Sequence, residues 1–247
     1  MTCRWPRAAW ITAALLLLPV SASAQSINVN LSAAGPTATG QIVRLVLLIT
    51  VLSLAPSLVV MVTAFTRIVI VLSFLRTAIG LQQTPPNPVL IGLALFLTGF
   101  VMAPAFETAW RDGLEPMMAE RVDQATGIER TVAPFRSFMA RQVRDEDLAL
   151  FLDIAHEAPP TSRDPVSLRV LLPAFMISEL RRAFEIGFIV FVPFLVIDMV
   201  VASILMSMGM MMLPPVMISL PFKIIFFVLV DGWSLVAGSL VQSFGPL

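Results

Sequence analysis

Four long apolar segments set the organisation of this chain. They run over Leu45–Thr66, Val89–Phe106, Ile186–Leu213 and Val216–Leu240. The first carries no charged residue and makes about 33 Å of helix, enough to cross the hydrocarbon core of a membrane. Because the apolar residues continue without alternation over helical lengths, the pattern predicts an all-α protein of integral-membrane-type helical hairpins, with four spans.

Turn-forming residues separate the members of each pair of segments. Gly80–Pro88 reads GLQQTPPNP, and three prolines in four residues cannot continue a helix. The last two segments are joined by a methionine-rich stretch that ends in Pro214 and Pro215. We therefore predict a first helical hairpin at 42–106 and a C-terminal helical hairpin at 186–247 with a methionine-rich turn.

A charged stretch lies between the two predicted hairpins. Residues 107–185 hold 14 of the 16 acidic residues and 10 of the 16 basic ones. Apolar residues recur at helical spacing in Val132–Val143 and again in Leu148–Leu152, which predicts short amphipathic helices. Asp145, Glu146 and Asp147 are typical of a helix start, because acidic side chains favour the first turn. This stretch is predicted to be an acidic helical domain inserted between the hairpins.

The N-terminus has the features of a secretory signal peptide. Arg4 and Arg7 precede an apolar run, Ala8–Val20, which is too short to span a bilayer. The sequence Ala22-Ser23-Ala24 then predicts cleavage between Ala24 and Gln25. We expect a signal peptide at 1–24 and a flexible periplasmic leader at 25–41. The alternative is an uncleaved anchor helix.

This signal fixes the expected topology. The mature chain starts in the periplasm, so the turn between the first two spans faces the cytoplasm, where Arg67 and Arg76 agree with the positive-inside rule. The second span then returns to the periplasm, which makes 107–185 a periplasmic domain of a bacterial inner-membrane protein. Hydropathy does not distinguish a helix that faces lipid from one that faces other subunits.

Composition supports a membrane protein and excludes several kinds of chemistry. Hydrophobic residues make up 57% of the chain and charged residues 13%, against about 45–50% and about 25% in soluble domains. Loss of Arg4 and Arg7 with the signal peptide takes the formal net charge from 0 to −2, so no basic face is expected for nucleic acid.

The same cleavage removes the one cysteine, Cys3. With one lysine and one histidine, Lys223 and His156, the sequence offers no P-loop and no histidine-rich metal site. We expect neither an enzyme nor a cofactor.

Three charged residues lie inside apolar segments, namely Asp198, Lys223 and Asp231. Such residues need partners, because an unpaired charge at the centre of a membrane helix costs about 2.5–3.5 kcal/mol on insertion scales. Lys223 and Asp231 are two turns apart if they share one helix, too far for a direct pair. Two alternatives remain open: buried assembly or gating contacts, or an Asp198–Lys223 pair that sets the register of the hairpin. Glu179 is a further candidate for a buried or intersubunit charge; the alternative is a local helical pair with Arg182, three residues later.

The turn MSMGMMMLPP places five methionines together, namely Met206, Met208, Met210, Met211 and Met212. Methionine is unbranched and apolar, so it adapts to irregular gaps. The stretch either fills a buried hairpin tip or, in a ring of subunits, lines a constriction.

Three blocks of the sequence resemble one known family closely. Met61–Pro104, Pro173–Phe188 and Leu220–Trp233 look like the signature blocks of the FliP family, export-gate membrane proteins of the flagellar type III secretion system. The resemblance covers nearly all of residues 41–244, in order. Homologues from injectisomes share the same helical architecture, but the sequence FTRIVIVLSFLR favours the flagellar branch.

The resemblance implies a pore-forming subunit in the flagellar basal body that passes unfolded exported proteins. It implies five copies that assemble with one FliR and four FliQ subunits into a closed helical cone, with FlhA and FlhB as further partners. In the assembled family gate, much of the complex sits above the bilayer plane. The methionines best match the family's gasket at Met210, Met211 and Met212. Two alternatives stay open: a subunit of a virulence injectisome, and an ion-coupled transporter that uses Asp198, Lys223 and Asp231.

Overall fold

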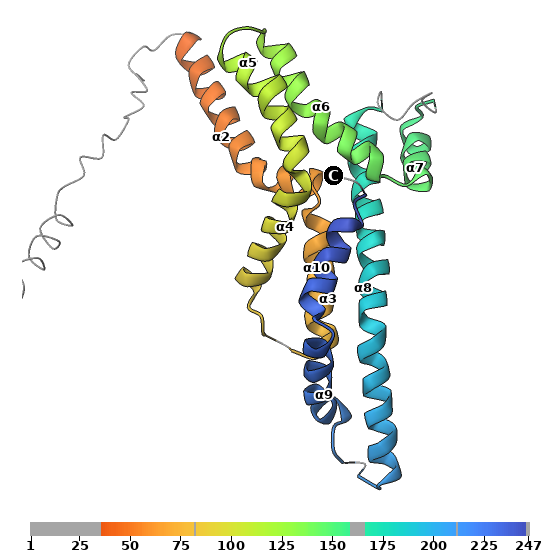
Figure 1. Ribbon diagram of the computed structural model, residues 1–247. Coiled ribbons are helices and arrows are strands. Elements are labelled where there is room, and N and C mark those ends of the chain that lie inside the picture. Colours follow the sequence, from red (N-terminus) through yellow and green to blue (C-terminus); the bar gives the residue numbers. More distant parts are fainter. Residues whose placement is uncertain (1–35, 82, 159–165, 211, 246–247) are drawn as a thin grey trace, which may run out of the picture. The chain divides into compact units, whose positions relative to one another are not determined.

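A computed structural model describes residues 36–81, 83–158, 166–210 and 212–245. The chain divides into two units, Met1–Val51 and Leu52–Leu247. Throughout the described residues the regular structure is helical, as predicted (Figure 1). The predicted signal peptide and the Ala24–Gln25 cleavage site lie outside the described residues. Of the predicted leader, residues 36–41 belong to the first described helix, α2 (Pro36–Val62).

The first apolar segment is divided between two helices. Helix α2 ends at Val62, and α3 (Phe65–Ile79) begins after the buried residues Thr63 and Ala64. The predicted turn follows α3 because Gly80 adopts a left-handed conformation, with φ 89°, and its N–H donates to the carbonyls of Arg76 and Thr77. Glycine adopts this conformation without the penalty that a Cβ brings. Helix α4 (Asn87–Thr108) then starts with proline in its first turn, where no N–H is needed.

Helix α4 continues into a short π-helical stretch, η1 (Ala109–Leu114), and then α5 (Glu115–Met118). Helix α6 (Gln124–Gln142) packs back against η1 and α4. Asp123 caps α6, since its carboxylate accepts a hydrogen bond from the Thr126 N–H at 3.2 Å. Hydrogen bonds from Thr126 to this exposed carboxylate lower the pKa of Asp123.

Helix α7 (Asp145–Ala155) begins at the acidic cluster that predicted it. Helix α8 (Leu168–Ser207) is 40 residues long. It runs without a break past residue 186, where the composition changes from charged to apolar. Prolines 159, 160 and 165, which the sequence places in a loop, lie outside the described residues.

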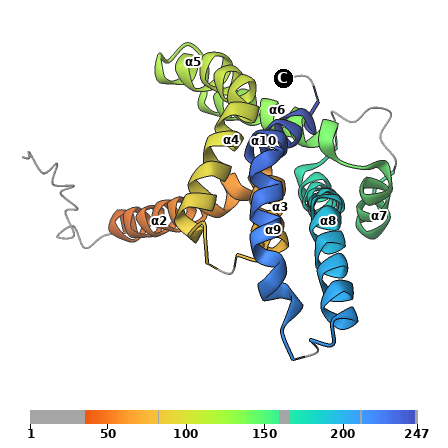
Figure 2. The ribbon, with the colours of Figure 1, turned by 60° about the horizontal axis from the view of Figure 1, so that its bottom comes forward.

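The C-terminal hairpin bends in its second arm. Helix α9 (Pro215–Leu229) and helix α10 (Gly232–Gln242) meet at an angle of 63°. Figures 1 and 2 show α9 beside the C-terminal half of α8, and α3 packs against both helices.

Two helical stretches in the described part are long and apolar enough to span a membrane. They are Asn87–Met118 and Leu168–Ser207, each with an 18-residue window, of mean hydropathy 2.3 and 2.7 respectively, and the bent pair α9–α10 is a third if it counts as one span. The predicted count of four spans is not confirmed. In α2, the stretch Leu45–Leu54 is apolar but shorter than the two spans.

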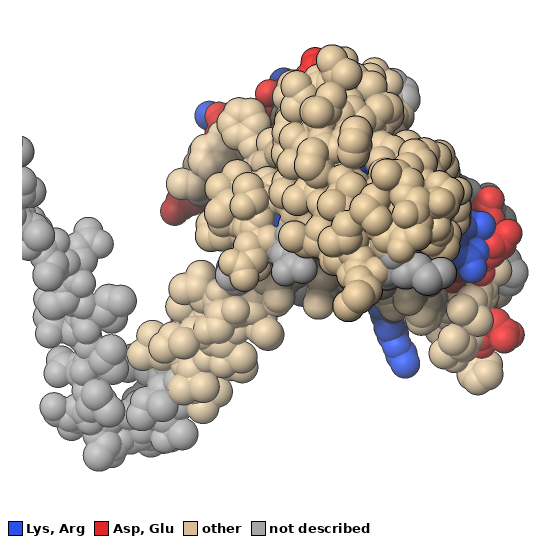
Figure 3. All heavy atoms as spheres, turned by 90° about the horizontal axis from the view of Figure 1, so that it is seen from below, with Lys and Arg blue, Asp and Glu red and all other residues tan. Residues whose placement is uncertain are grey.

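The core lies where α3 meets α8. Fully buried aliphatic side chains of α3, such as Ile68 and Leu72, contact a cluster that includes Leu171 and Phe175 of α8. Helices α3 and α8 approach closely at Gly187, where an added Cβ would lie 2.6 Å from the Phe74 ring. The surface seen from below consists almost entirely of uncharged residues, with charged residues gathered at its edges (Figure 3).

We expect Gly113→Ala to destabilise the fold, because its Cβ would lie 2.6 Å from the backbone nitrogen of Thr131 and force η1 away from α6. Overpacking of this kind costs about 1–3 kcal/mol. The matched control is Gly99→Ala in α4, where nothing lies within 4 Å of the added Cβ. Thermal melting of the detergent-solubilised variants measures the difference. Equal melting temperatures would contradict the close packing of η1 on α6.

Candidate functional site

A buried ion pair joins α3 to α8. Arg67 Nε donates to Glu179 Oε2 at 2.9 Å, and its Nη2 contacts the other carboxylate oxygen, so the pair is bidentate. Both side chains are 0% exposed. Taking two charges out of water is costly, and a bidentate geometry with further hydrogen bonds offsets that cost.

Arg67 also binds two other parts of the chain. Its guanidinium donates to Gln142 Oε1 at the end of α6, and to both the carbonyl oxygen and the hydroxyl of Ser243, each at 3.0 Å. The Phe244 ring lies 3.9 Å from the guanidinium carbon, a cation–π contact. Gln142 Nε2 in turn donates to the Phe244 carbonyl oxygen at 2.8 Å. One arginine therefore holds α3, α6, α8 and the C-terminal segment together.

This cluster differs from what the local sequence suggests. Glu179 bonds Arg67, which is 112 residues away, rather than Arg182; Arg182 instead donates to Gln142 at 3.4 Å. Because Arg67 is buried, it does not lie at an aqueous turn, and the positive-inside argument for that turn depends on Arg76. An arginine inside an apolar run is the signal that could have identified Arg67, since such a charge needs a partner.

A second ion pair lies in the C-terminal hairpin. Lys223 Nζ of α9 donates to Asp198 Oδ2 of α8 at 2.7 Å and to the Ala78 carbonyl of α3 at 3.1 Å. Ser219 Oγ donates to Asp198 Oδ1 at 2.5 Å. The Lys223 side chain is 4% exposed and that of Asp198 is 24% exposed. This geometry matches the alternative in which the pair sets the register of the hairpin.

Asp231 does not share a helix with Lys223, contrary to the two-turn spacing expected. It lies between α9 and α10 with φ 48°, in the left-handed region that non-glycine residues rarely adopt. Its side chain is exposed and makes no hydrogen bond or ion pair with any residue that the structure describes.

The methionine turn is exposed in the single chain. Met206, Met208 and Met212 are all exposed, and the Met212 side chain is 98% accessible. Gly209 makes the turn with φ 74°, and the Met210 N–H closes it with a hydrogen bond of 3.0 Å to the Leu205 carbonyl. Met210 is half-buried, and Met211 lies outside the described residues. The turn therefore does not bury its own methionines.

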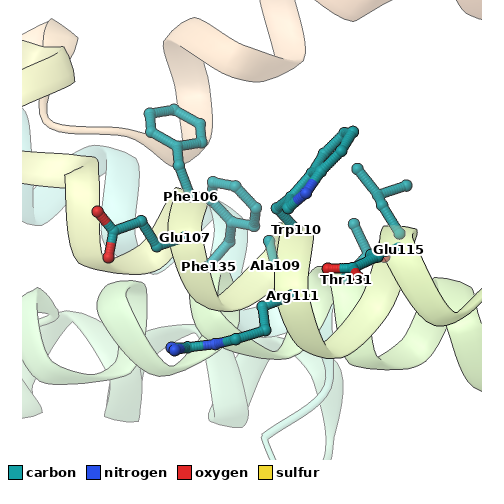
Figure 4. Close-up of a pocket in the computed structure, with 9 residues that line it drawn as sticks. Phe106, Glu107, Ala109, Trp110, Arg111, Glu115, Thr131 and Phe135 are labelled. Carbon is teal, nitrogen blue, oxygen red and sulfur yellow. The ribbon is translucent and has the colours of Figure 1, made fainter.

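A groove runs along η1 and α6, with a volume of about 810 Å³ (Figure 4). The Phe106 and Phe135 rings meet in it edge to face at 5.5 Å, and the Trp110 ring stands beside them. The Glu107 and Arg111 side chains both extend to the left in Figure 4 with their charged ends apart, and Arg111 Nε instead lies 3.9 Å from Asp112 Oδ1. Among the described residues no group of three or more His, Cys, Asp or Glu side chains could hold a metal ion.

We expect Glu179→Leu to destabilise the fold strongly, because the Arg67 charge stays buried without its carboxylate. Breaking a buried pair in this way costs about 3–5 kcal/mol. The double variant Arg67→Met, Glu179→Leu should lose much less than the sum of the two single changes. Thermal melting in detergent gives the comparison.

The matched control for this prediction is Arg181→Ala. Its pair with Glu146 has a length of 3.3 Å and both side chains are well exposed, at 49% and 72%. An exposed pair contributes about 0–1 kcal/mol, so the melting temperature should change little. If Glu179→Leu melts like this control, the buried cluster does not hold the fold together.

Comparison with known proteins assigns the chain to a family. The model of the FliP family matches residues 48–240. The flagellar biosynthetic protein FliP of Caulobacter vibrioides is 59% identical over 232 residues, which cover 94% of this chain and 87% of the relative. FliP of Rhizobium meliloti is 55% identical over 205 residues, covering 82% and 84%, and FliP of Bacillus subtilis 54% over 213 residues, covering 86% and 96%.

The matched region contains both ion pairs, the bend at Asp231 and the methionine turn. It ends at residue 240, just before the C-terminal segment that binds Arg67. The family match covers well over half of the chain, and the identities extend over most of each relative. This protein belongs to the FliP family.

Proposed function

We propose that this chain is a pore-forming subunit of the flagellar type III protein export gate, needed for secretion of flagellar proteins and for flagellum assembly. Five copies surround a channel, together with FliQ and FliR, and FlhB and FlhA are further partners. The complex belongs to the inner membrane within the flagellar basal body. Family membership supports this, as do relatives named flagellar biosynthetic proteins.

The exposed apolar surface supports an assembled rather than a solitary protein. Phe96 on α4 and Leu229 on α9 are each 80% exposed, and uncharged residues cover the face shown in Figure 3. Contiguous apolar surface of this kind is covered by a membrane or by other subunits. Stability of the long hairpins thus depends on what surrounds them.

The observation that carries the proposal is the exposed methionine turn. In a single chain, Met206, Met208 and Met212 expose their side chains at the end of the α8–α9 hairpin. A ring of copies would bring these turns to one axis, where flexible apolar side chains seal against each other or around a passing chain. An apolar constriction also excludes ions by dewetting.

The geometry disfavours the transporter alternative. Asp198 and Lys223 form an ion pair within one chain. Asp198 also accepts a hydrogen bond from Ser219, and Lys223 donates one to the Ala78 carbonyl. The pair is therefore a structural contact rather than an open ion site. The names of the relatives favour the flagellar gate over an injectisome. Residues 107–185 would then form the periplasmic part, which includes the acidic helix α7.

We expect replacement of Met210, Met211 and Met212 by alanine to leave assembly intact and to make cells leak small ions. Three shorter side chains open the seal while the Gly209 turn is kept. Conductance or dye entry in cells that express the full gate measures the leak. The matched control is Met118→Ala, which removes an exposed methionine of α5, away from the turn. Correctly assembled gates with an unchanged leak would remove the gasket hypothesis.

We expect native mass spectrometry of the chain expressed with FliQ and FliR to give a pentamer that takes up these two proteins. The reason is that the exposed hairpin faces remain uncovered in one copy. A stable monomer or dimer that ignores these partners, and that supports saturable solute flux, would instead favour a transporter.

A further inference from the structure

The inference concerns Asp231 and rests on the proposed self-association. Asp231 occupies the bend between α9 and α10 with a strained backbone and a carboxylate that contacts no described polar group. The residues around it are apolar and exposed, including Val228, Leu229 and Trp233. A carboxylate in such surroundings is costly once the apolar face is covered, so the covering chain has to supply a partner.

Most charged residues of the apolar hairpins within Leu52–Leu247 form ion pairs in the single chain. Outside residues 107–185, the described charged residues of this unit are Arg67, Arg76, Asp198, Lys223 and Asp231. Arg67 binds Glu179, and Lys223 binds Asp198. One cation and one anion are left over, Arg76 and Asp231.

Arg76 is bound only by neutral groups in this chain. Its guanidinium donates to Asn87 Oδ1 at 2.6 Å and to the Pro85 carbonyl at 3.4 Å, both in the turn before α4. Both bonds start from the same nitrogen, Nη1. Its remaining N–H groups can therefore donate to a carboxylate without loss of these contacts, since a guanidinium has five.

We propose that Asp231 of one copy forms an ion pair with Arg76 of a second copy. The two residues are the complementary unpaired charges of the same apolar region, and they lie on different helices of one chain. Such a contact joins two different surfaces, so it is heterologous and repeats from copy to copy around a ring. The surface around the α9–α10 bend is thus one side of a copy-to-copy interface.

The positions of the two residues along the helices constrain how the copies meet. The Lys223–Ala78 hydrogen bond places these residues at one level. In Figure 1 helix α3 runs down to the Gly80–Pro88 turn, and α9 runs up from the methionine turn. Residues before Ala78 and residues after Lys223 therefore lie on the same side of that level, and these include Arg76 and Asp231. At about 1.5 Å per residue, Arg76 lies about 3 Å and Asp231 about 12 Å from it. In a closed ring the copies are related by rotation alone, so the extended arginine and aspartate side chains have to span the difference of about 9 Å along the axis.

The first experiment is site-directed cross-linking in membranes that contain the full gate. The chain carries Arg76→Cys and Asp231→Cys in a Cys3→Ser background. A short bis-maleimide cross-linker is used, because an arginine–aspartate pair separates the Cα atoms by more than the roughly 4.4–6.8 Å that a disulfide needs. We expect a ladder of covalent multimers up to the full ring, and none with either single cysteine.

The outcomes separate this inference from the proposed function. Native mass spectrometry of the same sample reports whether copies associate at all. An associated ring without a ladder overturns the Asp231–Arg76 contact and leaves the gate proposal standing. A cross-link from Asp231→Cys to one of the smaller subunits also overturns it. Failure of the copies to associate overturns both.

The second experiment reverses the charges. Asp231→Arg and Arg76→Asp should each weaken copy-to-copy association about tenfold or more, which corresponds to a coupling of about 1.4 kcal/mol. The double reversal should restore most of it. Asn87→Ala is the matched control, because it removes the Arg76–Asn87 contact and keeps the cation; association should change little. Failure of the double reversal to recover association would overturn the pair.

Discussion

The burial of one guanidinium is the constraint on which the rest of this fold depends. Arg67 sits between α3 and α8 with no contact with water, and its charge is stable there only while a carboxylate and several neutral acceptors surround it. Those acceptors come from α6 and from the last residues of the chain. The helices therefore have one relative placement in which this charge is satisfied, which apolar packing alone would not specify.

Local signals predicted local structure correctly. The acidic run at Asp145 begins α7, and the proline-rich turn separates α3 from α4, because first-turn charge and missing N–H groups act within a few residues. The sequence also predicted an all-helical chain and its family. The five methionines were identified as a unit, and the structure adds that the turn leaves three of them exposed.

Features that depend on distant contacts or on bends escaped prediction. Arg182 is three residues from Glu179, so it looked like the natural partner, whereas the actual partner lies on another helix. The bend at Asp231 was not predicted, because hydropathy measures how apolar a segment is and not whether its helix changes direction. The Asp231-Gly232 dipeptide is a turn signal that could have located the bend. The count of four spans is not confirmed, because one apolar stretch is shared by the two bent helices α9 and α10.

The segment after α10 has a consequence for the order of folding. Ser243 and Phe244 complete the shell around Arg67, although Ser243 lies 176 residues further along the chain. Closing so long a loop is entropically costly, so this contact is expected to form late. A chain whose helices have packed before this segment docks holds a buried cation with an incomplete set of acceptors. The docking of the segment therefore completes the fold, because the cation is satisfied only when all of its partners are in place.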